Sequence, residues 1–79
     1  HVALGKLIIY GAGQNGRLLA QRLTSDPARE HELLGFIDDD KLKQNKQIHG
    51  LPVLGGHDAM EDILASSGCT DLVVAITNP

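Results

Sequence analysis

The chain has 79 residues, of which 42% are hydrophobic and 22% charged, and its formal net charge at pH 7 is −3. This length is that of one small domain, and the hydrophobic share can build a core that a disordered chain lacks. The acidic balance argues against nonspecific nucleic-acid binding, which needs a basic face. The single cysteine, Cys69, excludes an internal disulfide framework. No apolar run approaches the roughly 20 residues that span a bilayer, so direct membrane insertion is not expected.

A short apolar run from Leu7 to Tyr10 forms the first predicted strand. Its continuous, β-branched character is typical of a strand that is covered on both faces within a parallel sheet. Beyond the following glycines, apolar residues recur at helical spacing, which predicts a helix over 14–24. The segment around Pro27 ends that helix.

The middle of the chain contains two further apolar segments. The first, over 33–37, is predicted to be a buried strand, and three aspartates stop it. A polar stretch over 41–46 is expected to form an exposed loop. The segment over 48–54 predicts a weak third strand, because Gly50 and Pro52 interrupt it.

The last third of the sequence predicts a helix followed by a strand. Asp58 is the expected N-cap of a helix over 59–67, and Gly68 stands where the glycine after a helix belongs. The inward face of this helix would carry Met60, Ile63 and Leu64. A final buried strand is expected over 72–76.

Strands and helices alternate along this chain, and short segments connect them. That order predicts an α/β fold with a Rossmann-like, doubly wound parallel sheet, in partial form with about four strands and two helices. The chain begins with His1 rather than Met and stops just after an apolar run. We therefore expect residues 1–79 to be a single nucleotide-binding domain from a longer, membrane-associated protein.

The segment Gly11 to Gly16 matches the pattern G-x-G-x-x-G between a buried strand and an amphipathic helix. Gly11 would allow the tight turn, Gly13 the approach of a pyrophosphate to the backbone, and Gly16 close packing of helix and strand. The N–H groups at the start of the helix, where Gln14 and Asn15 lie, would hold the phosphate charge. A glycine turn that serves packing alone remains the alternative.

Asp38 follows the second predicted strand, 22 positions after Gly16. The dinucleotide-binding pattern places an acidic residue about 20 positions on, where it accepts a hydrogen bond from a ribose hydroxyl. A carboxylate there favours NAD over NADP, because it repels a 2′-phosphate. Asp39 and Asp40 are expected to be solvated. The alternative for all three aspartates is stabilisation of the turn by their side chains.

The remaining reactive residues predict neither a catalytic centre nor a metal site. The four histidines are scattered without the spacing of metal ligands, and no carboxylate pair or serine–histidine pair is visible. Thr77 follows the last strand at the edge where α/β sheets collect ligands, so it could touch a bound nucleotide. The sequence therefore predicts a domain that binds a ligand and leaves catalysis to other residues.

Four segments together, "LIIYGAGQNG", "LLGFIDDD", "IHGLPVLGG" and "DLVVAIT", resemble the nucleotide-binding domain of bacterial polysaccharide-biosynthesis proteins. That family's domain is Rossmann-like and is also described as CoA-binding-like. The resemblance implies that Gly11, Gly13 and Gly16 contact phosphate and that Asp38 contacts ribose. NAD is the expected ligand, with a UDP-sugar or CoA as alternatives.

The resemblance also implies what the parent protein does. It would be a nucleotide-sugar epimerase/dehydratase or a polyprenyl-phosphate sugar transferase, with membrane helices and a catalytic domain elsewhere in its own chain. This domain would then lie at the cytoplasmic face of the inner membrane. The N-terminal domain of sugar O-acetyltransferases is similar too, but it usually differs at Gln14, Asn15, Thr77 and Asn78. A regulatory or structural N-terminal domain of either kind of transferase is the alternative.

Overall fold

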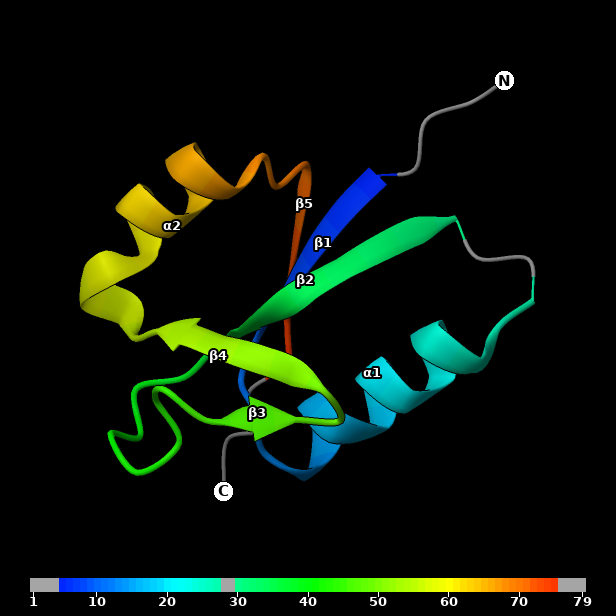
Figure 1. The fold of residues 1–79 in the computed structure, drawn as a ribbon, viewed down its shortest axis with the longest axis horizontal. Coiled ribbons are helices and arrows are strands. Elements are labelled where there is room, and N and C mark those ends of the chain that lie inside the picture. Colours follow the sequence, from blue (N-terminus) through cyan, green and yellow to red (C-terminus); the bar gives the residue numbers. More distant parts are fainter. Residues whose placement is uncertain (1–4, 28–29, 76–79) are drawn as a thin grey trace.

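The computed structural model describes residues 5–27 and 30–75 of the chain. The described elements form one five-stranded sheet in the order β3-β4-β2-β1-β5, in which β3 is antiparallel to β4 and the other pairs are parallel. This architecture, shown in Figure 1, confirms the predicted α/β class with a partial Rossmann-like sheet. The elements are β1 (Gly5–Tyr10), α1 (Gln14–Ser25), β2 (His31–Ile37), β3 (Gln47–Ile48), β4 (Leu51–Gly55), the 3-10 helix η1 (His57–Ala59), α2 (Met60–Ser67) and β5 (Asp71–Val74).

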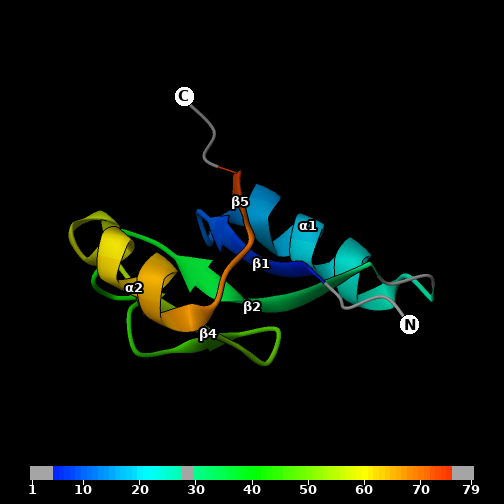
Figure 2. The ribbon, with the colours of Figure 1, turned by 90° about the horizontal axis from the view of Figure 1, so that it is seen from above.

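The core lies between the central strands and the helices. Ile8 and Ile9 of β1 and Phe36 and Ile37 of β2 are completely buried, because these strands occupy the middle of the sheet. The helix α1 contributes Ala20 to the core. Figures 1 and 2 show the strands passing between α1 and α2, which lie on opposite sides of the sheet.

The order in which strands are added to the sheet reverses at β1, and this reversal creates the place where a ligand could bind. From β1 the chain continues outward through β2 to β4, and α2 then returns it to β5 on the other side of β1. The crossover through α1 therefore leads to β2 on one side of β1, and the crossover through α2 leads to β5 on its other side. In open α/β sheets this switch point is where ligands bind.

The segment predicted as a single weak strand over 48–54 is a hairpin, so that prediction is wrong in detail. Ile48 of β3 pairs with Leu51 of β4, and His49 and Gly50 form the two-residue connection with φ of 53° and 75°. Positive φ at both positions is the geometry of the type I′ turn, which suits the twist of paired strands. Pro52 does not break the hairpin, because it pairs with Gln47 between the hydrogen-bonded positions, and the next N–H, that of Val53, donates to the Lys46 carbonyl at 2.9 Å.

The start of α2 also differs from the prediction. Asp58 is not its N-cap, because the Ala59 N–H donates to the Gly56 carbonyl at 3.1 Å and closes a 3-10 turn that contains Asp58. The N-cap position falls on Ala59, without a side-chain cap. The end of α2 is as predicted, since Gly68 adopts the left-handed conformation with φ of 76°. The expected inward residues of α2, namely Met60, Ile63 and Leu64, are half-buried.

The last strand is more exposed than its apolar sequence predicts. It covers Asp71–Val74, and Ile76, which was expected to belong to it, lies outside the described residues. Val74 is 65% exposed and Leu72 36%, because β5 forms the edge of the described sheet. The helix predicted over 14–24 is confirmed to within one residue. In the part of the chain that the structure describes, no helix has the length and apolar character to cross a membrane.

Candidate functional site

Gly11 and Gly16 are required by the fold of the turn between β1 and α1. Gly11 has φ of 112°, a conformation that side-chain-bearing residues rarely adopt, and its N–H donates to the Ile37 carbonyl at 2.7 Å. A Cβ atom at Gly16 would lie 1.9 Å from the Gly11 carbonyl oxygen. The helix can therefore approach the turn only when position 16 has no side chain. Backbone conformation accounts for Gly11, and close packing of the helix against the turn accounts for Gly16.

Gly13 differs from its two neighbours in the motif. Its backbone is extended, with φ of −80° and ψ of −162°, which does not require glycine. Apart from Gly13 itself and its two chain neighbours, the described residues place no heavy atom within 4 Å of a Cβ atom built there. Because Gly13 lines a pocket, a side chain at this position would project into open space beside the start of α1. The fold itself gives no reason for glycine at position 13.

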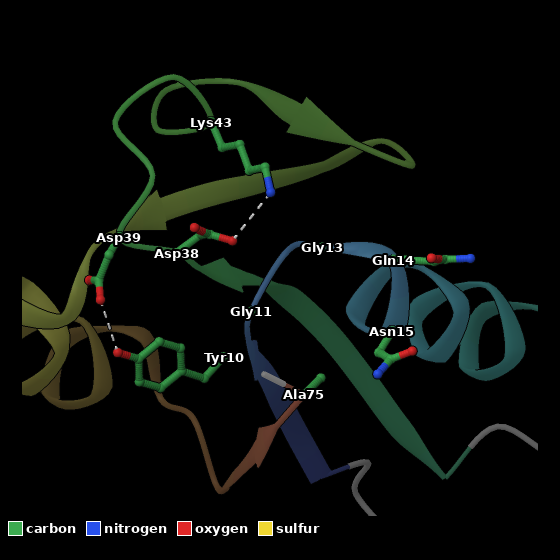
Figure 3. Close-up of a pocket in the computed structure, with 9 residues that line it drawn as sticks. All are labelled: Tyr10, Gly11, Gly13, Gln14, Asn15, Asp38, Asp39, Lys43 and Ala75. Atoms are coloured by element: carbon green, nitrogen blue, oxygen red, sulfur yellow. Dashed lines mark hydrogen bonds and ion pairs between the residues drawn. The ribbon is translucent and has the colours of Figure 1, made fainter. Parts of the chain in front are cut away.

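The pocket beside Gly13 has a volume of about 310 Å³ and lies at the carboxyl ends of β1, β2 and β5. Figure 3 shows that the glycine turn, the segment after β2 and the end of β5 meet around it. Gly16 lies buried beneath the turn, and Thr77 lies outside the described residues. The lining residues are Tyr10, Gly11, Gly13, Gln14, Asn15, Asp38, Asp39, Lys43 and Ala75.

The start of α1 faces this pocket with unsatisfied backbone donors. The first hydrogen bond of the helix runs from the Arg17 N–H to the Gly13 carbonyl at 3.0 Å, so the N–H groups before Arg17 have no partner within the helix. The N-cap, Gly13, provides no side-chain acceptor, and the first turn of α1 contains no acidic residue. An anion would complete this helix end, where the positive end of the helix dipole favours negative charge.

Asp38 lies directly after β2, and its carboxylate is tied to the glycine turn. Its Oδ2 accepts a hydrogen bond from the Ala12 N–H at 2.7 Å, and its Oδ1 accepts one from the Asp40 N–H at 2.8 Å. The second bond is the turn chemistry that the sequence left as an alternative. The carboxylate also lines the pocket, so this turn role does not remove it from the candidate site.

Lys43 is a pocket residue that the sequence did not indicate. Its segment was expected to be a solvated loop, but the Gln44 side chain donates to the Asp38 carbonyl at 3.0 Å and folds the loop back. The Lys43 Nζ then lies 3.8 Å from Asp38 Oδ2, and both side chains are largely covered. Figure 3 shows the ammonium group pointing toward Asp38. No spacing rule connects these two residues, so only the folded loop reveals the pair.

Tyr10 and Asp39 form the opposite wall of the pocket. Asp39 is exposed, as predicted, yet it accepts hydrogen bonds from the Tyr10 hydroxyl at 3.3 Å and from the His57 N–H at 2.6 Å. The rings of Tyr10 and His57 lie 6.1 Å apart. Partial desolvation, together with the negative charge of Asp39, raises the pKa of the Tyr10 hydroxyl above its usual value, so the neutral phenol is favoured.

Two curated proteins resemble this chain in sequence. It is 32% identical over 74 residues to the probable polysaccharide biosynthesis protein EpsC of Bacillus subtilis. This match covers 94% of this chain and 12% of that protein. It is 35% identical over 77 residues to the Trk system potassium uptake protein TrkA of Vibrio alginolyticus, with coverage of 92% of this chain and 16% of that protein. The chain thus spans a small part of the length of either relative.

Two solved structures share the fold. A UDP-D-quinovosamine 4-dehydrogenase from Vibrio fischeri superposes with a TM-score of 0.79 at 28% identity, over 91% of this chain and 57% of that one. A Rex-family repressor, RSP, superposes with a TM-score of 0.81 over 95% of this chain and 35% of the other, but at 24% identity it shows the fold alone.

The family of the chain follows from a match to nearly its whole length. The model of one protein family matches residues 6–79, a range that includes the glycine turn, Asp38 and all of the described strands except the first residue of β1. The predicted resemblance to a Rossmann-like domain found in polysaccharide-biosynthesis proteins is confirmed by this match together with the similarity to EpsC. The chain belongs to the PglD N-terminal domain family.

Proposed function

We propose that this domain binds the diphosphate of a nucleotide at the start of α1, within a bacterial protein of polysaccharide biosynthesis that acts on nucleotide sugars. The relatives support the context: one is named for polysaccharide biosynthesis, and a structural neighbour is named as a dehydrogenase of a UDP-sugar. NAD is the first candidate ligand, and a UDP-sugar or CoA are alternatives with the same diphosphate. In this proposal the domain binds the nucleotide, and the epimerase or dehydratase chemistry belongs to residues outside it.

Gly13 is the observation that carries the proposal. Its backbone conformation and surroundings would accept a side chain, in contrast to Gly11 and Gly16. A side chain at Gly13 would stand where a pyrophosphate approaches the free N–H groups of the first helical turn. Ligand binding accounts for the missing side chain, whereas packing does not.

The proposed orientation of the nucleotide follows from Asp38. A diphosphate at Gly13 leaves the attached ribose at the end of β2, where the Asp38 carboxylate lines the pocket. The carboxylate oxygens accept one N–H each from the described backbone, and each oxygen retains a lone pair for a ribose hydroxyl. The sugar or nicotinamide end then extends toward Ala75 at the end of β5.

The test uses Tyr10, which is the only tyrosine in a chain without tryptophan, so its fluorescence reports on the pocket. The chain is titrated with NAD, UDP-N-acetylglucosamine and CoA, and titration calorimetry confirms each affinity. We expect at least one of the three to bind. The Gly13→Val variant should lose that binding and keep the thermal stability of the parent, because its side chain enters open space.

The matched control is Gly50→Ala in the hairpin turn. It is expected to lower the stability, because Gly50 has φ of 75°, and to leave nucleotide binding unchanged. Binding by Gly13→Val that equals binding by the parent would overturn the phosphate assignment. If none of the three nucleotides binds, the proposed function itself is wrong.

A second candidate is a regulatory or structural domain that acts on the rest of its own chain. The observation that favours it is the 35% identity to a protein named for potassium uptake, which carries this sequence pattern in a different context. A sensing domain would bind its nucleotide without a sugar. Binding of NAD with no detectable binding of UDP-N-acetylglucosamine, alone or in the presence of NAD, would favour this second candidate.

A further inference from the structure

A second hollow, between α1 and the β3–β4 hairpin, adjoins the pocket beside Gly13, which we call the nucleotide pocket. It consists of two parts of about 530 and 350 Å³, and both parts are lined by Arg17, Lys43 and His49. Lys43 also lines the nucleotide pocket, so the two spaces meet at its side chain. We call the space formed by these two parts the hairpin groove.

The hairpin groove concentrates positive charge in an acidic molecule. The chain has a net charge of −3 and seven lysine and arginine residues, of which Arg17, Lys43 and Lys46 line this one groove. Asp40 is the carboxylate among the lining residues, and its Oδ1 already accepts a hydrogen bond from the Leu42 N–H at 2.9 Å. The balance of charge in the groove therefore favours an anion.

Two of the basic residues of the groove contact groups at the edge of the nucleotide pocket. The Arg17 Nε donates to the Ala12 carbonyl at 3.2 Å, which anchors the guanidinium group beside the glycine turn. The Lys43 Nζ lies 3.8 Å from the Asp38 carboxylate. A ligand group that reaches from Asp38 into the hairpin groove would meet both cations. The left-handed backbone of His49, with φ of 53°, places a third nitrogen-bearing side chain along the same groove.

From this arrangement we propose that the hairpin groove binds a phosphate monoester carried on the ribose of the bound nucleotide. The inference rests on the proposed function, because it takes the diphosphate at Gly13 and the ribose at Asp38 as given. The ribose hydroxyls would then lie between Asp38 and Lys43, and a phosphate on one of them enters the groove. Lysine and arginine side chains bind phosphate through charge-assisted hydrogen bonds. Since the Asp38 carboxylate disfavours a charged group on the 2′-oxygen, the 3′-position is the expected site.

The experiment compares two pairs of ligands that differ only in the ribose phosphate. NADP differs from NAD by a 2′-phosphate, and CoA differs from dephospho-CoA by a 3′-phosphate, while all four carry the same adenosine diphosphate. We expect CoA to bind the parent chain about tenfold more tightly than dephospho-CoA, the effect of one charge-assisted hydrogen bond. If NADP binds more tightly than NAD, and CoA binds no more tightly than dephospho-CoA, the groove is assigned to a 2′-phosphate.

The matched variants are Lys46→Gln and Lys41→Gln. Lys46 lines the groove but not the nucleotide pocket, whereas Lys41 is an exposed residue of the same loop that is not among the lining residues. Both variants remove one positive charge, so any general electrostatic effect is equal. We expect Lys46→Gln to lose most of the gain from the ribose phosphate and Lys41→Gln to retain it.

Three outcomes separate this inference from the proposed function. If dephospho-CoA or NAD binds and the added phosphate changes its affinity less than threefold, the groove assignment is wrong and the proposed function stands. An equal loss in both variants would also overturn the groove assignment, because it would reflect overall charge. If none of the four nucleotides binds, the groove assignment fails, and the proposed function fails with it only if UDP-N-acetylglucosamine does not bind either.

Discussion

The three glycines of one motif have two different physical explanations. Gly11 and Gly16 are glycine because the chain could not otherwise fold, given the positive φ of the first and the carbonyl oxygen that faces the second. Gly13 has neither constraint. The motif therefore contains two glycines that the fold requires and one, Gly13, that is a candidate for ligand binding.

We predict that Gly16→Ala unfolds or strongly destabilises the domain. Its Cβ would stand 1.9 Å from the Gly11 carbonyl oxygen, which belongs to the backbone and cannot rotate away. Overpacking typically costs about 1–3 kcal/mol of the free energy of unfolding, and a contact this close with the backbone is expected to reach the upper end of that range or exceed it. Urea denaturation followed by circular dichroism measures the loss. Gly13→Ala is the control, and equal stability of the two variants would contradict the close approach of α1 to the turn.

We predict that Asp38→Asn raises the affinity for NADP relative to NAD. The Asn oxygen can still accept the Ala12 N–H, so the glycine turn keeps its bond, while the negative charge near the 2′-position is removed. Repulsion between two unit charges at about 4 Å is roughly 1 kcal/mol in water and larger when partly desolvated, so a change of about tenfold in the affinity ratio is expected. Calorimetric titration of both cofactors measures the ratio. An unchanged ratio would remove Asp38 from the ribose.

Among the elements, the β3–β4 hairpin shows how a turn decides a local structure. The connection of His49 and Gly50 needs positive φ at both residues, and this closes the chain into two short antiparallel strands. The hairpin stands where a doubly wound fold commonly carries a crossover helix. The groove beside α1 exists because the hairpin, rather than a helix, borders it.

We predict that His49→Asn stabilises the domain modestly. Asparagine adopts the left-handed conformation more readily than histidine, and Asn-Gly is the favoured pair for a type I′ turn. The expected gain is about 0.5 kcal/mol in the free energy of unfolding, which a urea midpoint can resolve. Asn45, which already has φ of 65°, provides the comparison: Asn45→His should lower the stability by a similar amount. A loss of stability in His49→Asn would show that the imidazole makes contacts worth more than the turn preference.

For the whole molecule, we predict that the chain alone does not transform a nucleotide sugar. The acidic groups of the pocket, Asp38 and Asp39, are engaged by backbone N–H groups or by Tyr10. In the proposed orientation they face the ribose and the pocket wall, whereas a catalytic base must lie within about 3 Å of the reacting sugar atom. The chain is incubated with UDP-N-acetylglucosamine and NAD, and a keto-sugar is sought by NMR. Turnover above that of Gly13→Val would place a catalytic group within these residues.

The sequence by itself determined the class of the fold and the position of the glycine turn. Apolar runs and helical spacing are local signals, so β1, α1 and the end of α2 at Gly68 could be predicted from neighbouring residues. The acidic residue after β2 could also be predicted, because the spacing of the motif follows from the length of one helical crossover. These features depend on contacts that are close in the chain.

The tertiary structure decided which residues share the pocket. Lys43 beside Asp38, and Asp39 bridging Tyr10 and His57, depend on loops that fold back over the sheet edge, and no sequence period encodes such contacts. The hairpin groove likewise depends on the distance between α1 and the turn at His49. The distinction between Gly13 and the other two glycines of the motif also required the tertiary structure, because it depends on which atoms a side chain at each position would meet. The residues that line the pocket come from separate segments of the chain, whereas helices and strands are encoded by neighbouring residues.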